Sequence, residues 1–387
     1  MSGPSFLPEA DDAVLVGRVW HAATQGPRPV VVKDGAAHDL FTVARTVSEL
    51  FERPDLLELL RSVDRPLRSS VEDLVERVGQ TDADHLLAPV DLQVIKACGV
   101  TFVDSMIERV IEERSAGDAT RATEVRATLA EVLETSLSDV APGSPEADRV
   151  KEVLSAQGLW SQYLEVGLGP DPEVFTKGPV LSAVGTGAPI GVPSFSRWNN
   201  PEPELVLVVD SGGTPRGATL GNDVNLRDVE GRSALLLGKA KDNNGSTAVG
   251  PFVRVFDEGF SLEDVRTARI SLRVEGGDGY VMEGENNVAR ISRPLEELVM
   301  ATHGAHHQYP DGFALFTGTL FAPVDDRHTP GSGFTHDLGD VVTISSPLLG
   351  TLQNVVGRAE ELAPWDHGIT HLLDYLLTRQ ARGDGPR

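Results

Sequence analysis

The feature that most constrains this chain is a pair of apolar segments joined by a Gly/Pro turn near the middle of the sequence. Residues 201–223 are PEPELVLVVDSGGTPRGATLGND, in which the run LVLVV is followed by SGGTP and then by a shorter apolar run, ATL. Gly and Pro end the first run and favour a tight reversal of the chain. The pattern predicts two strands that form a β-hairpin.

Three carboxylates lie at the open end of this predicted hairpin. Glu202 and Glu204 are two residues apart where the first strand begins, and Asp223 ends the second strand. Residues i and i+2 of a strand point to the same face. The three side chains would repel one another unless a cation lay between them, and all-oxygen ligation favours Mg²⁺, Mn²⁺ or Ca²⁺ over Zn²⁺. The alternative is that they are solvated residues at a strand edge and in a turn.

Length and charge limit the possible classes of protein. The chain has 387 residues, 40% of them hydrophobic, which is enough for one large or two smaller domains. The net charge of -24 argues against nucleic-acid or anionic-membrane partners, but not against a small anionic substrate beside a bound cation. The only cysteine is Cys98, so no intrachain disulfide can form. We find no signal peptide and no membrane-length apolar run, and we expect a cytoplasmic protein.

The order of the predicted elements indicates an α+β protein. Residues 1–85 combine two short strands with amphipathic helices and are predicted to form a small N-terminal α/β domain. A mainly-β catalytic domain is predicted over residues 86–387. Helices are predicted within it at 103–114, 119–137 and 145–157, and from 158 onward the pattern is mainly β. We expect the segment from about 104 to 157 to be a helical lid over the site.

Three other motifs have competing interpretations. HGAHH places His303, His306 and His307 at helical spacing, which suits either a zinc site or a helix surface, and the second is favoured. Cys98 is expected to be a buried apolar residue more than a nucleophile. EGGDGY at 275–280 is expected to be a hairpin turn, since no phosphate-binding sequence follows it.

Several of these residues together resemble the fumarylacetoacetate hydrolase family. An E-x-E strand precedes N-D-x-x-x-R-D, and a lysine stands nine residues before Gly-Pro. The late segments FALFTGTLFAP and LGDVVTISSPLLGTLQNVV are also similar to that family. The resemblance extends over roughly 86–365 and implies a Mg²⁺ site at Glu202, Glu204 and Asp223 and an active-site lysine at Lys241. It also implies a homodimer or homotetramer.

One departure from the family pattern bears on the reaction. Where the family has G-x-N-Y-x-x-H, with a histidine that serves hydrolysis, this chain has GVTFVDS and therefore Ser105. Glu108, three residues on, matches an acidic residue often found there. The loss of the histidine weakens the assignment as a C–C bond hydrolase.

Longer strings, among them LLAPVDLQ, FTKGP, WNNPEPE and HQYPDGFALF, are similar to a dehydratase branch of the family. The resemblance implies Mg²⁺-dependent dehydration of a 2-keto-3-deoxy-pentonate to 2,5-dioxopentanoate, in oxidative pentose catabolism. A hydrolase, hydratase or decarboxylase acting on a diketo acid, and a non-enzymatic binding protein with a retained metal site, remain alternatives.

The resemblance also suggests roles for individual residues. We expect Glu108 to act in acid–base catalysis and Lys241 to stabilise oxyanion charge. Arg227 and Asp228 are expected to orient Lys241 or to bind the substrate. Ser105 and Thr319 are the other expected substrate contacts, Thr319 through its hydroxyl to the substrate carboxylate.

Overall fold

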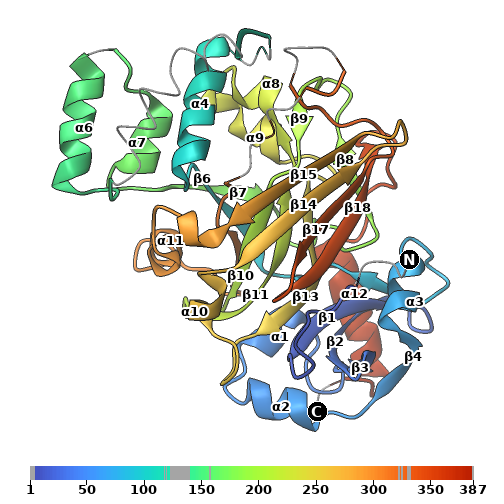
Figure 1. Ribbon diagram of the computed structural model, residues 1–387. Helices are drawn as coiled ribbons and strands as arrows, with labels where there is room; N and C mark the ends of the chain where they lie inside the picture. Colours follow the sequence, from blue (N-terminus) through green and yellow to red (C-terminus); the bar gives the residue numbers. More distant parts are fainter. Residues whose placement is uncertain are drawn as a thin grey trace.

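The computed structural model of the protein describes residues 5–116, 118, 120–122, 140–156, 158–320, 323, 326–328 and 333–385. Two large β-sheets form its centre, and helices lie around them (Figure 1). The combination of mixed sheets with separate helices confirms the predicted α+β class.

The larger sheet has eleven strands among the described residues and is antiparallel except where β16 meets β6. From one edge to the other its strands are β4 (Pro66–Ser70), β3 (Ala36–Asp39), β2 (Gly26–Lys33), β1 (Leu15–His21), β13 (Thr247–Val255), β11 (Pro215–Asp223), β10 (Pro203–Val209), β16 (Phe313–Phe316), β6 (Val94–Gly99) and β7 (Glu173–Gly178), with β5 (His85–Leu87) paired to β1.

The N-terminal residues extend this sheet. β1 pairs with β13, with Val16 opposite Val253, and β5 pairs with β1. Three helices, α1 (Val47–Phe51), α2 (Leu56–Ser62) and α3 (Val71–Glu76), accompany these strands. The predicted strands and helices of this region are therefore present, and their sheet is continuous with that of the later residues. The division into domains at residue 85 stays a prediction.

The smaller sheet packs against the centre of the larger one (Figure 1). Its strands are, in order, β15 (Val281–Asn287), β14 (Arg269–Glu275), β17 (Val341–Ser346), β18 (Gly350–Arg358) and β8 (Pro189–Val192). Buried and exposed residues alternate along β14, as expected for a strand with one solvated face. EGGDGY forms the β14–β15 hairpin turn, as predicted.

The predicted central hairpin is confirmed as β10 and β11, with Leu205 opposite Leu220. Every residue of β10 is buried. Leu205 and Leu207 belong to the core between the two sheets, whereas Val206 and Val208 belong to a second core on the opposite face. Burial on both faces explains the uninterrupted apolar run, because neither side of the strand meets water.

Three helices form a separate cluster at one end of the molecule (Figure 1). They are α4 (Val103–Ser115), α6 (Pro145–Ala156) and α7 (Gln162–Leu168). The predictions for 103–114 and 145–157 are thus confirmed, and the hydroxyl of Ser144 accepts a hydrogen bond from the amide of Ala147 (3.2 Å) at the start of α6. The helix predicted at 119–137 lies almost entirely outside the described residues.

The remaining elements include helices that the mainly-β prediction after residue 158 lacked. They are β9 (Asn199–Asn200), β12 (Asn225–Leu226), α8 (Arg227–Glu230), a 3-10 turn (Ala234–Leu236), α9 (Leu237–Lys241), α10 (Leu262–Val265), a second 3-10 turn (Val288–Arg290), α11 (Leu295–Thr302) and α12 (Ile369–Ala381). In the described part of the chain, no helix has the length and apolar character needed to cross a membrane.

Candidate active site

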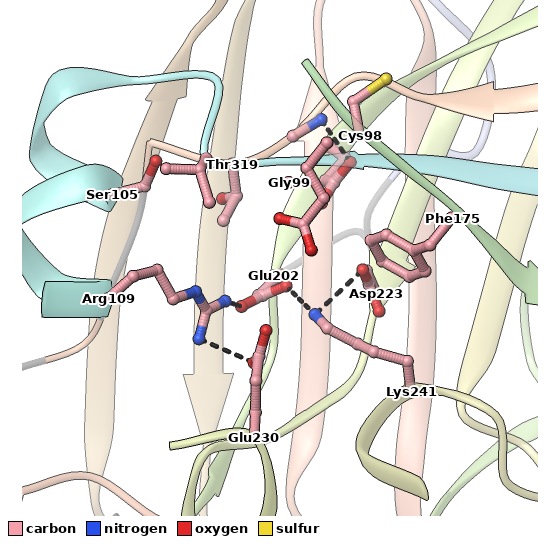
Figure 2. A pocket seen from close by; sticks show the side chains of 14 residues that line it. Cys98, Gly99, Ser105, Arg109, Phe175, Glu202, Asp223, Glu230, Lys241 and Thr319 are labelled. Carbon is pink, nitrogen blue, oxygen red and sulfur yellow. Dashed lines mark hydrogen bonds and ion pairs between the residues drawn. The ribbon is translucent and has the colours of Figure 1, made fainter. Parts of the chain in front are cut away.

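The β10–β11 hairpin brings the three predicted carboxylates together. One oxygen from each of Glu202, Glu204 and Asp223 lies within 4.8 Å of the others, and all three side chains are buried. Figure 2 shows Glu202 and Asp223, both bonded to Lys241. The amide of Asp223 donates to the carbonyl of Glu202 (3.0 Å), which fixes the strand ends against each other. Within the described residues this is the only cluster of three or more potential metal ligands.

Buried cations surround two of the three carboxylates. Nζ of Lys241, at the end of α9, donates to Glu202 (2.6 Å) and to Asp223 (3.0 Å). Lys177, from β7, lies 3.0 Å from the other oxygen of Asp223. Nη2 of Arg109, from α4, donates to the second oxygen of Glu202 (2.7 Å). The pKa of Lys241 is raised by Asp223 and Glu202 in spite of its burial, so this lysine is charged at neutral pH.

Glu204 depends on the T-G-T turn after β16. The amide of Gly318 donates to its carboxylate (2.7 Å). Gly318 has φ +94°, and a Cβ atom there would lie 2.0 Å from the hydroxyl oxygen of Thr101, so the turn requires glycine. Burial, followed by the charges of Asp223 and Glu202, raises the pKa of Glu204 well above its ordinary value.

The charges around the pocket do not balance. Five carboxylates line it, from Glu173, Glu202, Glu204, Asp223 and Glu230. Three cations contact them, from Arg109, Lys177 and Lys241. When all are ionised, two negative charges remain in a largely buried site, which one divalent cation would neutralise. The clustered oxygen donors therefore fit Mg²⁺, Mn²⁺ or Ca²⁺.

Two of these acidic residues were not predicted from the sequence to be part of the site. Glu173, at the start of β7, lines the pocket, and burial, followed by the negative charge of Glu230, raises its pKa to about 7. Glu230, at the end of α8, lies 2.8 Å from Arg109. The string FTKGP had drawn attention to this strand, but Glu173 precedes that string by two residues and carries no motif of its own.

Helix α4 presents the expected Ser105 to the pocket, but Arg109 in place of Glu108. Glu108 is not among the lining residues. The hydroxyl of Ser105 donates to the carbonyl of Phe102 (2.8 Å). Glu108 instead accepts from Arg227 (3.1 Å). Residues four apart share this face of the helix more closely than residues three apart, which accounts for the difference.

Arg227 and Asp228 hold neighbouring segments in place. Besides Glu108, Arg227 donates to the carbonyl of Pro323 (2.9 Å), and its guanidinium carbon lies 4.4 Å from the ring centre of Trp198. Asp228 accepts from the hydroxyl of Ser196 and from the amide of Arg197, both at 2.8 Å. Neither residue lines the pocket, whereas Thr319 does.

The other motifs lie apart from the carboxylate cluster or have structural roles. Helix α11 ends at Thr302, so the three histidines follow the helix and the expected position on a helix surface is wrong. His303 contacts the carbonyl of Ser211 (3.1 Å), and His306 that of Ala301 (3.3 Å). Cys98 is buried on β6 at the pocket, where burial raises the pKa of its thiol.

Two curated proteins are similar to this chain in sequence. The chain is 32% identical, over 49% of its length and 60% of the relative's, to 2-dehydro-3-deoxy-D-arabinonate dehydratase of Saccharolobus solfataricus. It is 28% identical, over 86% of its length and 97% of the relative's, to a probable 2-keto-3-deoxyxylonate dehydratase of Haloferax volcanii. The chain thus spans less than two thirds of the first relative and nearly all of the second.

A solved structure confirms the fold. It is that of 2-keto-3-deoxy-D-arabinonate dehydratase complexed with magnesium and 2,5-dioxopentanoate, with a TM-score of 0.62 and 22% identity, covering 89% of this chain and 99% of that one. Residues 147–357 match the family model described as fumarylacetoacetate (FAA) hydrolase, C-terminal. That match covers more than half of the chain and includes the three clustered carboxylates and Lys241, and the chain belongs to the fumarylacetoacetate hydrolase family.

Proposed function

We propose that this protein is a metal-dependent hydro-lyase that converts a 2-keto-3-deoxy-pentonate to 2,5-dioxopentanoate. The observation that carries the proposal is the buried cluster of Glu202, Glu204 and Asp223, with Lys241 and Glu173 beside it in one pocket. Both curated relatives are named as dehydratases of such keto acids, which favours this reaction over others within the family.

The three clustered carboxylates would hold Mg²⁺, or Mn²⁺ or Ca²⁺ in its place. When bound, the cation supplies Lewis-acid polarisation of the 2-keto group, which makes the protons on C3 more acidic. Lys241, charged and directed at two of the ligands, stabilises the negative charge that develops on the 2-oxygen. Thr319 lies in the pocket lining and offers a hydroxyl to the substrate.

Glu173 is our candidate for proton transfer, in place of Glu108. A carboxyl group with a pKa of about 7 can accept a proton in one step and return it in the next at neutral pH. As a carboxylate it removes a proton from C3, and it then gives that proton to the hydroxyl on C4, whose C–O bond breaks to release water. This elimination leaves a C3=C4 double bond with the hydroxyl still on C5. Loss of a proton from C5 and protonation at C3 move the double bond to C4=C5, and the resulting enol tautomerises to the C5 aldehyde, so the net change is the loss of one water molecule.

The surroundings of Ser105 favour elimination over hydrolysis. Hydrolysis of a C–C bond requires an activated water, and no histidine is among the residues that line the described pocket. The hydroxyl of Ser105 is bound to the carbonyl of Phe102, and a serine without an adjacent base does not activate water near neutral pH. Elimination needs only the proton transfers that Glu173 can perform.

A coupled assay tests this function directly. Purified protein with Mg²⁺ is given each C4 enantiomer of 2-keto-3-deoxy-pentonate, and an NAD-dependent aldehyde dehydrogenase reports the C5 aldehyde of the product. We expect turnover of at least one enantiomer and its loss in EDTA. Rapid cleavage of a fumarylpyruvate-like diketo acid, with both pentonates untouched, would instead identify a hydrolase.

We also propose that the cluster of α4, α6 and α7 acts as a lid. Arg109 of α4 reaches the carboxylate cluster, so this helix contributes directly to the pocket wall. Closure over a keto acid would exclude water from the reaction. Crystals grown with and without 2-oxobutyrate should differ in the position of these helices, and identical positions in both would argue against a lid.

A further inference from the structure

Arg109 has a position that the proposed reaction has not yet used. Its guanidinium spans the pocket wall between two carboxylates, with Nη2 2.7 Å from Glu202 and Nη1 2.8 Å from Glu230 (Figure 2). Glu202 belongs to the candidate ligand set, whereas Glu230 does not. Glu230 thus anchors one side of the guanidinium, and the other side is directed at the cation site.

The three cations around the pocket differ in how accessible they are. The side chains of Lys177 and Lys241 are 0% and 3% exposed, and that of Arg109 is 13% exposed. Lys241 and Arg109 approach Glu202 from opposite sides (Figure 2). Arg109 is therefore the cation that a ligand entering the pocket can contact most readily.

We propose that Arg109 recognises the carboxylate of an anionic 2-keto acid bound at the cation site. The inference rests on the proposed function, because it assumes a ligand that chelates the cation through a carboxylate and the adjacent keto oxygen. A guanidinium in contact with a ligand oxygen of Glu202 lies within reach of any carboxylate bound to the same cation. Its planar fork matches a carboxylate, and Nη1 can stay on Glu230 while Nη2 turns to the ligand.

Charge supports the same assignment. With a divalent cation present, the five carboxylates and three basic side chains reach neutrality, and an anionic substrate adds one negative charge. Without Arg109, the substrate would enter a pocket that is already negative. Arg109 is thus the positioning residue for the anionic end of the substrate, and Glu230 is the residue that positions Arg109.

Calorimetry with 2-oxobutyrate tests this inference, because this keto acid has the carboxylate and keto groups but no hydroxyl to eliminate. At saturating Mg²⁺ we expect Arg109→Met to weaken 2-oxobutyrate binding by roughly 10–100-fold, because the variant loses a charge-assisted hydrogen bond to the ligand. Arg109→Lys should recover part of the affinity, since it restores charge without the fork. The matched control is Arg114→Met on the same helix, where the exposed Arg114 donates to the carbonyl of Gly158 (2.8 Å).

Two further measurements separate recognition from a purely structural ion pair. Titration with Mg²⁺ alone should give equal or tighter binding in Arg109→Met, because Glu202 loses a competing partner. In steady-state assays the variant should raise KM by the same 10–100-fold factor and change kcat by less than about tenfold. A structural role alone would lower the melting temperature and leave the affinity for 2-oxobutyrate unchanged.

Unchanged 2-oxobutyrate affinity in a folded, Mg²⁺-binding Arg109→Met protein would overturn the inference, whatever the reaction proves to be. If that variant does not fold, Glu230→Gln decides, since it should weaken 2-oxobutyrate binding by roughly 3–10-fold through a less well-oriented Arg109. Unchanged affinity there overturns the inference equally. If the wild type binds 2-oxobutyrate through Arg109 but dehydrates neither pentonate, the proposed function fails and the recognition role stands.

Discussion

The floor and the wall of the pocket are built in different ways. The floor is the β10–β11 hairpin, whose carboxylates are held by strand pairing and by burial on both faces. The wall is helix α4, which contributes Ser105 and Arg109 from one side and belongs to a separate helical core. Strand register fixes the floor residues, whereas the direction of a helix face decides which wall residues reach the pocket.

This difference has a chemical consequence. The floor residues are close enough together that each changes the charge state of the others, as the raised pKa of Glu204 shows. The wall residues contact the floor at single points, such as the bond from Arg109 to Glu202. We therefore expect changes in the floor to abolish cation binding and the reaction together, and changes in the wall to alter substrate binding or stability alone.

The largest effect is expected from Glu204→Gln. The substitution replaces one of the three clustered carboxylates with a neutral amide. Among the described residues no fourth side chain belongs to this cluster. Activity should fall by more than about 10³-fold, since losing the cation removes the Lewis acid from the reaction. Mg²⁺ calorimetry should show no tight binding, and the matched control Glu285→Gln, on the exposed face of β15, should change neither property. Wild-type Mg²⁺ affinity in Glu204→Gln would place the cation elsewhere.

The next largest effect is expected from Glu173→Gln, which changes a pocket carboxylate on β7 that belongs neither to the floor hairpin nor to the wall helix. We expect kcat to fall by roughly 10²–10⁴-fold, the usual cost of losing an acid–base group, while Mg²⁺ still binds. In the wild type, the dependence of kcat/KM on pH should show a group that titrates near 7 in the free enzyme, and this limb should vanish in the variant. A variant that keeps both the rate and the pH profile would remove Glu173 from the mechanism.

The same difference between floor and wall explains what could be predicted from the sequence. The cluster of three carboxylates was predicted because E-x-E at a strand start and Asp223 across a hairpin are local patterns with a fixed register, and because these residues also resemble the family's motif. Arg109 and Glu230 were missed because their partners are distant in the chain, 93 residues apart in the case of Arg109 and Glu202. Helix α12 was also not predicted, because its apolar residues pack on the N-terminal region and only the fold brings these together, as with Tyr375 against Phe41 in the turn after β3.

Cation binding should depend on pH, and the sign follows from the raised pKa values of two pocket carboxylates, Glu173 and Glu204. Raised pKa values mean that the cation-free pocket holds protons at pH 6 that a bound cation must displace. Mg²⁺ affinity should therefore rise by about tenfold or more between pH 6 and pH 8. The free energy of unfolding of the cation-free protein should change in the opposite direction. A carboxyl group whose pKa is raised in the folded state stabilises the fold at pH values below its pKa in the unfolded chain, and this stabilisation is lost as the pH rises through 7.

Thermal unfolding checks both parts of this prediction. At a concentration one hundred times its Kd, Mg²⁺ should stabilise the fold by about 2.7 kcal/mol, and at a fixed concentration the shift should be larger at pH 8 than at pH 6. Glu204→Gln should show no Mg²⁺-dependent shift at either pH. If Mg²⁺ stabilises the wild type equally at pH 6 and pH 8, no carboxyl group of the pocket loses a proton when the cation binds.

Glu108→Gln should have the smallest effect on catalysis. It tests most directly whether a residue of the wall helix can affect stability without affecting the reaction. Glu108 lies on α4 beside Arg109, yet it accepts from Arg227 and does not line the pocket. We expect kcat to change by less than about threefold, well below the cost of losing an acid–base group. Stability should fall by about 1–3 kcal/mol, because the buried Arg227 exchanges a carboxylate for a weaker neutral acceptor. Steady-state kinetics and urea unfolding measure the two effects separately. A hundredfold loss of kcat with normal Mg²⁺ binding would restore Glu108 as the acid–base residue that its position in the sequence first indicated.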